Sequence, residues 1–145
     1  DCIVQRMEQR DGEQAEEYDM PQEEKEKMPE QYEAVSLDDF VEYSQSMFEY
    51  WTEDDFASSF RKMLTIEQFR SEEMQKLYQQ YLVAGPASYV KALFESIGIV
   101  NAKDKAARFY AVMHFYYSLY DGAADKEKVK VEFVSAIKSL VQDLA

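Results

Sequence analysis

The stretch that decides the fold is "FYAVMHFYYSLYDGAADKEKVKVEF", residues 109–133. Its first half is almost entirely aromatic or aliphatic, an Asp-Gly pair then ends the apolar run, and charged residues follow. A helix that is apolar on all sides must be buried on all sides. The sequence therefore predicts a central helix at about 103–120, and the question is what covers each of its faces.

The composition favours a single all-helical domain. With 145 residues, the chain is close to the commonest domain size, and 46% hydrophobic content is enough for one core. Glycine and proline are scarce, with four and three residues, and good helix formers dominate. No segment shows a competing strand pattern. We expect an all-α helical bundle.

Apolar residues recur at helical spacing from residue 36 onward, as in the series Phe40, Tyr43, Met47, Phe48 and Trp51. Expected N-caps and helix breaks divide the rest of the chain. The expected N-caps are Ser36, the segment Thr52–Asp55, Ser71 and Asp125, and the expected breaks are Gly85-Pro86 and Gly98. The sequence thus predicts six successive helices in a domain spanning residues 36–145.

The first part of the chain has a different character. Residues 1–19 begin with the helical pattern "DCIVQRM", and residues 20–35 form an acidic segment that contains Pro21 and Pro29. The first 34 residues hold 12 acidic and 4 basic side chains. We expect a helix followed by a linker or loop. Its charge is consistent with a solvated surface or with an interaction tail.

Charge and cysteine content exclude several classes of protein. A net charge of −13 disfavours binding to nucleic acid, because phosphate contacts require clustered Lys and Arg. The single cysteine, Cys2, cannot form an internal disulfide. No stretch is long and apolar enough to span a bilayer, and the start lacks the pattern of a signal peptide. We expect a cytoplasmic protein without a membrane partner.

The last two predicted helices are joined by the short link 122–124, so they should lie antiparallel. Both have more apolar surface than the other helices obviously cover, and a second copy of the chain is an economical cover. We therefore expect a two-fold homodimer. The candidate contacts are Ala107, Ala111, His114, Ser118, Phe133, Ile137 and Leu140.

Two segments carry a resemblance to a known family. "FRKMLTIEQFRSEEMQKLYQQYLVAGPASYVKALFESI" (60–97) and "AARFYAVMHFYYSLYDGAADKEKVKVEFVSAIKSL" (106–140) resemble the C-terminal regulatory half of TetR-type transcriptional regulators. The opening "DCIVQRM" resembles the helix that leaves their DNA-binding domain. The likeness lies in helix lengths and side-chain classes rather than in a fixed motif.

This resemblance implies a bacterial small-molecule sensor. A ligand inside the helical domain changes the spacing of paired helix-turn-helix units, and the last two helices form a dimeric four-helix bundle. No helix-turn-helix precedes Asp1 here. DNA binding is therefore expected only through an N-terminal domain of a parent protein.

The expected ligand is a mainly apolar, aromatic or otherwise flat small molecule in each subunit, since such pockets are largely apolar with a few polar groups. Aromatic rings supply rigid walls, methionines adapt to irregular shapes and tyrosine hydroxyls orient polar groups. The candidate ligand residues are Tyr43, Met47, Trp51, Phe60, Met63, Tyr78, Phe94, Tyr110 and Tyr117. The same aromatic stripes also fit a plain hydrophobic core.

No catalytic, metal or cofactor site is predicted. The only histidine, His114, has Ala111 three residues before it, so the Glu-x-x-His motif of bundle metal sites is absent. Cys2 has no histidine nearby in sequence, and no glycine-rich phosphate loop occurs. The alternative function is a helical protein–protein interaction module without a small ligand. A solid core would favour that alternative over a sensor.

Overall fold

A computed structural model describes residue 5 and residues 37–144, and the second of these ranges is helical throughout apart from short connections. The helices are α4 (Leu37–Glu53), α5 (Asp55–Glu67), α6 (Glu72–Leu82), α7 (Ala84–Ser96), α8 (Ala102–Gly122) and α9 (Lys126–Leu144). The predicted all-α fold is confirmed for this part of the chain. The segments predicted at 1–19, apart from residue 5, and at 20–35, and the N-cap Ser36, lie outside the described residues.

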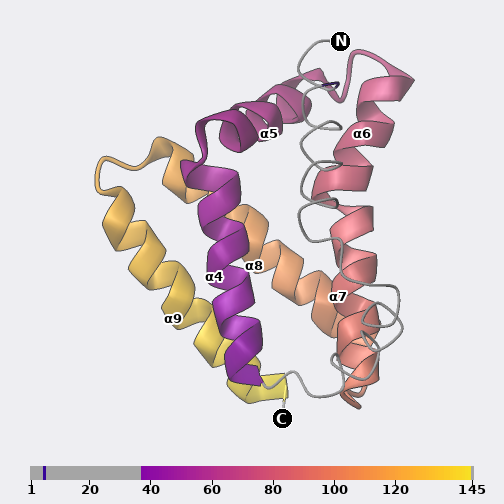
Figure 1. Cartoon of the computed structure of the whole chain (residues 1–145), viewed down its shortest axis with the longest axis vertical. Coiled ribbons are helices and arrows are strands. Elements are labelled where there is room, and N and C mark those ends of the chain that lie inside the picture. The colour runs from indigo at the N-terminus through magenta and orange to yellow at the C-terminus, as the bar shows by residue number, and fades with distance from the viewer. Residues whose placement is uncertain (1–4, 6–36, 145) are drawn as a thin grey trace, which may run out of the picture.

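Helix α4 runs through the middle of the bundle (Figure 1). It contacts α5, α8 and α9, while α8 also contacts α7 and α9. Helix α5 crosses one end, and α6 and α7 follow each other along the side opposite α9 (Figure 1). The apolar helix α8 is therefore covered by three helices of its own chain, which answers most of the question its sequence raises.

The starts of α5 and α6 follow from local capping groups. Ser71 caps α6 by accepting a hydrogen bond from the Met74 amide at 3.2 Å, as predicted. The N-cap of α5 is Asp54, whose carboxylate accepts from the Ala57 amide at 2.8 Å. Thr52 lies inside α4 and donates its hydroxyl to the Phe48 carbonyl, a back-bond that suits a threonine within a helix. The cap expected at Thr52–Asp55 is thus Asp54.

The break between α6 and α7 lies at Val83, whose φ of −130° and ψ of −86° are not helical. Gly85 and Pro86 occupy the first turn of α7, where proline is tolerated because its missing N–H has no intrahelical partner. The predicted stop at Gly98 is confirmed. Gly98 has a φ of 81°, and the Ile99 amide donates to the Phe94 carbonyl at 2.9 Å, as in a Schellman cap.

The core is built from stacked aromatic rings. Six phenylalanines are almost completely inaccessible to solvent: Phe40, Phe48, Phe60, Phe94, Phe109 and Phe133. Phe48 of α4 stacks on Phe133 of α9, with 4.2 Å between ring centroids, and on Tyr117 of α8, with 5.6 Å. The Phe48 ring of α4 therefore packs against both α8 and α9.

This packing corrects two of the expected dimer contacts. Phe133 and Ile137 are 0% and 1% exposed within the single chain, so neither can form the surface of a subunit interface. The apolar stripe of α9 faces α4 as well as α8. Periodicity identifies a buried face but does not say whether its cover comes from the same chain or from another copy.

The other dimer candidates occupy different positions. Ala107, Ala111 and Ser118 lie exposed on α8, and His114 and Leu140 are half-buried. The three exposed residues leave the proposed homodimer open as a prediction.

Candidate functional site

The interior contains a charged residue at a core-facing position. Helix α5 buries Ala57, Phe60, Arg61 and Leu64, which share one helical face. Arg61 is 5% exposed, so its guanidinium group must find partners within the protein. Arg61 therefore places a charged, hydrogen-bonding group next to the hydrophobic core.

Arg61, in the middle of α5, connects the ends of α4 and α8. Its Nε donates to the Trp51 carbonyl in the last turn of α4 at 2.9 Å. Its two terminal nitrogens donate to both carboxylate oxygens of Asp121, near the end of α8, at 2.9 and 2.7 Å. The Arg61 Cζ atom also lies 5.0 Å from the centroid of the Tyr117 ring, within range of a cation–π contact. The charge of Arg61 is thus neutralised by Asp121, whose own side chain remains partly exposed.

Next to this ion pair lies a group of tyrosines that we call the tyrosine cluster: Tyr43 of α4, Tyr89 of α7, and Tyr110 and Tyr117 of α8. Burial raises the pKa of Tyr110, and interactions with Tyr43 and Tyr89 raise it further. Burial likewise raises the pKa of Tyr117, with Tyr110 adding to the shift and Arg61 partly opposing it. At neutral pH both phenols are protonated, so each can donate as well as accept a hydrogen bond.

His114 lies beside the tyrosine cluster and contacts the chain where α6 ends and α7 begins. Its ring is 5.6 Å from the Tyr117 ring and 6.3 Å from the Tyr110 ring, measured between centroids. Its Nε2 atom lies 2.7 Å from the Leu82 carbonyl oxygen. Because a carbonyl can only accept, Nε2 carries the proton and donates it. His114 therefore ties α8 to the end of α6.

The structure brings some of the nine expected ligand residues together. Trp51, Phe60, Phe94 and Tyr117 are buried, while Tyr43, Met47, Met63, Tyr78 and Tyr110 are half-buried. Tyr43, Tyr110 and Tyr117 interact within the tyrosine cluster, and the Trp51 and Phe60 rings lie 6.4 Å apart.

Phe94 contacts Phe40 in another part of the core. Met47, Met63 and Tyr78 pack against the core from its edges. The expected ligand set is therefore spread over the core, and only part of it is gathered around Tyr117.

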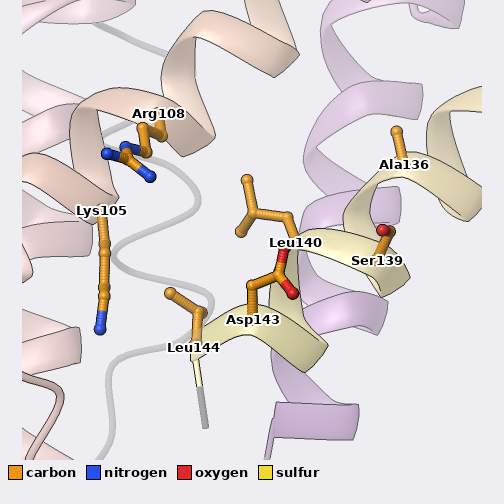
Figure 2. A pocket seen from close by; sticks show the side chains of 7 residues that line it. All are labelled: Lys105, Arg108, Ala136, Ser139, Leu140, Asp143 and Leu144. Carbon is orange, nitrogen blue, oxygen red and sulfur yellow. The ribbon is translucent and has the colours of Figure 1, made fainter.

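Two surface pockets lie elsewhere, on α9. The first, of about 280 Å³, runs between α8 and α9 and is lined by Lys105, Arg108, Ala136, Ser139, Leu140, Asp143 and Leu144. Figure 2 shows Lys105 and Arg108 on one side of this pocket, and Leu140, Asp143 and Leu144 on the other. The second pocket, of about 460 Å³, has Gln45 of α4 and residues of α9 on its walls. None of the nine expected ligand residues lines either pocket.

Neither a metal site nor a membrane-spanning helix is present in the part of the chain that the structure describes. No group of three or more His, Cys, Asp or Glu residues is placed to hold a metal ion in residues 37–144. Over the same range, no helix is long and apolar enough to cross a membrane. The site contains phenol groups that can form hydrogen bonds, the Arg61–Asp121 ion pair and the faces of aromatic rings. These groups suit the binding of a small molecule.

Comparison with known proteins gives no relatives. No protein-family model matches the chain, and no curated protein or solved structure shows significant similarity to it. The resemblance to TetR-type regulators therefore rests on the sequence pattern alone.

Sequence reasoning missed two members of the site, Arg61 and Asp121. Arg61 had a visible signal, because it falls on the same helical face as Phe60 and Leu64, where a charge is unusual. Asp121 had none, because 60 residues separate it from Arg61. Pro86 was expected to break a helix. Nothing in the sequence indicates that His114 forms a hydrogen bond with the Leu82 carbonyl, which lies four residues before Pro86.

Proposed function

We propose that this chain is the small-molecule-sensing and dimerisation domain of a TetR-like transcriptional regulator, in which ligand binding alters the DNA affinity of a parent protein. The observation that carries the proposal is the tyrosine cluster. A core that only needed stability would gain little from several phenol groups and a buried arginine with a partly buried carboxylate partner, since apolar replacements of such pairs are often as stable. Polar groups within an aromatic interior are the usual composition of a ligand site.

The electrostatics of the cluster favour a neutral ligand. Burial and neighbouring phenols raise the pKa of Tyr110 and Tyr117, so this environment disfavours negative charge. Asp121 already neutralises Arg61, so no unpaired cation at that position awaits an anionic group. We therefore favour a flat, uncharged aromatic molecule with one or two polar groups. It would stack on the rings and hydrogen-bond to the tyrosine hydroxyls.

A thermal-shift screen tests the proposal. The panel contains neutral aromatic compounds, each paired with its carboxylate analogue, and Trp51 fluorescence serves as a second readout. A ligand that binds only the folded state at a hundredfold excess over its Kd adds about 2.7 kcal/mol of stability. The neutral member of a pair should raise the Tm more than its carboxylate analogue.

Conservative variants locate the binding site. Tyr110→Phe and Tyr117→Phe keep the rings and remove the hydroxyls, so each should weaken binding by up to about tenfold through one lost hydrogen bond. Tyr116→Phe is the matched control, because Tyr116 is a half-buried tyrosine of the same helix that contacts Phe133 instead. Equal affinity in all three variants, or no stabilising compound in the panel, would count against the sensor.

The second candidate is a protein–protein interaction module, favoured by a separate observation. Phe115 and Leu119 of α8 are 57% and 40% exposed and lie one helical turn apart. Exposed apolar side chains on one face are typical of an interaction surface. A chain that self-associates through α8 but binds no compound in the screen would support this module over the sensor.

A further inference from the structure

Two carbonyl groups at helix ends receive their hydrogen bonds from side chains of other helices. The Trp51 carbonyl, in the last turn of α4, accepts from Arg61 of α5 at 2.9 Å. The Leu82 carbonyl, at the last residue of α6, accepts from His114 of α8 at 2.7 Å. Carbonyls in the last turn of a helix lack intrahelical donors, and a buried one without a partner is costly. Arg61 therefore stabilises the break between α4 and α5. His114 stabilises the break between α6 and α7.

The need for His114 follows from Pro86. In an uninterrupted α-helix the Leu82 carbonyl would accept from the amide four residues later. That residue is Pro86, which has no N–H. The backbone hydrogen bonds on either side are present: the Val83 amide donates to the Gln79 carbonyl, and the Ala87 amide donates to the Val83 carbonyl. His114 thus supplies the one donor that Pro86 removes.

Both bridging side chains contact the same ring. The Tyr117 ring lies 5.0 Å from Arg61 Cζ and 5.6 Å from the His114 ring, and Phe48 stacks on it nearly in parallel, at 11°. Tyr117 is 5% exposed. A ring enclosed in this way cannot shift without displacing its neighbours, because protein interiors are close-packed.

We propose that Tyr117 couples the α4–α5 break to the α6–α7 break. A displacement of its ring disturbs the Arg61 and His114 contacts together, so the two breaks loosen or tighten in concert. The use of this coupling as the response to a ligand in the tyrosine cluster rests on the proposed function. The coupling itself is a property of the ligand-free chain and is tested without any ligand.

Hydrogen exchange of the intact chain measures both breaks at once. The amides in residues 83–87, which include those of Val83 and Ala87 but none at Pro86, report on the α6–α7 break. The amides of residues 57–58, which are bonded to Asp54, report on the α4–α5 break. His114→Phe keeps an aromatic ring and removes the donor. We expect exchange at 83–87 to rise about tenfold, the equivalent of one lost hydrogen bond, and exchange at 57–58 to rise as well.

The reverse variant tests the same coupling from the other side. Arg61→Lys keeps the charge and loses the planar guanidinium and its Nε donor. Exchange should then rise at 57–58 and also at 83–87, although no residue of that second segment has been changed. This variant also covers the case in which His114→Phe does not fold.

The decisive comparison removes the ring that lies between the two bridges. In a Tyr117→Leu background, His114→Phe should still loosen 83–87 but should no longer affect 57–58. Tyr116→Leu is the matched control, because the ring contacts of Tyr116 are with Phe115 and Phe133 rather than with Arg61 or His114, and in that background the cross-effect should persist. A cross-effect that survives Tyr117→Leu, or one that never appears in either direction, overturns the coupling.

Discussion

Arg61 carries a charge that is almost fully buried, and its side-chain hydrogen bonds go to the ends of α4 and α8. Removing one partner of such a buried pair leaves an uncompensated charge, whereas replacing both by apolar residues is often harmless. The pair therefore contributes less to net stability than to fixing how α4, α5 and α8 meet. Asp121 would be unfavourable near the negative end of α8 on its own, and Arg61 offsets that effect.

The phenols of the tyrosine cluster make stability depend on pH in the alkaline range. The folded-state pKa values of Tyr110 and Tyr117 are raised above the ordinary value of 10.0. The stability that these neutral phenols represent is fully present below about pH 10. Above that pH the unfolded chain loses protons that the folded chain retains, so stability falls as pH rises.

The measurement is urea unfolding at several pH values between 8 and about 11.5. Tyr117→Phe should flatten the alkaline loss, by up to about 1.4 kcal/mol per pH unit. Phe109→Leu serves as a control, because it removes core packing without removing an ionisable group, and should lower stability equally at every pH. An unchanged alkaline slope in Tyr117→Phe would contradict a protonated, buried phenol.

At the level of the helices, local sequence signals predicted where the helices end, but the sequence did not predict which helices contact one another. Asp54, Ser71 and Gly98 act within one helical turn of themselves, so capping rules located the helix ends to within a few residues. Burial of Phe133 was also predictable from its spacing. That its cover is Phe48, 85 positions earlier in the same chain, was not, because periodicity carries no information on the identity of the partner.

The candidate site shows the same division. The tyrosines of α8 were selected from the sequence, and the structure brings Tyr110 and Tyr117 together with Tyr43 of α4. Their charged neighbour Arg61 was overlooked, although its position on the helical face of Phe60 was visible. The partner of His114 could not be found by any local rule, because the bond spans 32 residues.

The close approach of the chain at Gly85 yields a prediction at this scale. A Cβ at Gly85 would collide with the Gln80 carbonyl oxygen and carbon, which are backbone atoms and cannot rotate away. Gly85→Ala should therefore destabilise the fold by about 1–3 kcal/mol, as overpacking does.

Gly122 provides the matched control in thermal or urea unfolding. A Cβ there meets nothing within 4 Å, and the residue lies in the last turn of α8. Gly122→Ala should stabilise by about 0.4–1 kcal/mol through loss of unfolded-state entropy. Similar effects of the two substitutions would show that α6 and α7 do not approach each other as closely as the structure indicates.

Across residues 37–144, the protein combines a covered interior with a partly apolar face on α8. Ala111, Phe115, Ser118 and Leu119 are exposed at spacings of three, four and seven or eight residues, so they share a helical face. Small residues at Ala111 and Ser118 would allow a second helix to approach closely. Because Phe133 and Ile137 are occupied within the chain, this face of α8 is the part of the predicted dimer surface that remains available.

We therefore propose that two copies associate through the exposed face of α8. Sedimentation at micromolar concentration should show a dimer for the unmodified chain and a monomer for Phe115→Asp, which places a charge where a desolvated contact is needed. Val100→Asp is the control, because Val100 is 71% exposed and lies in the α7–α8 connection, away from this face. Ile137→Asp is not a suitable test, since Ile137 is a core residue and its substitution would unfold the chain. A monomeric unmodified chain, or a dimer that Phe115→Asp leaves intact, would exclude an interface on this face.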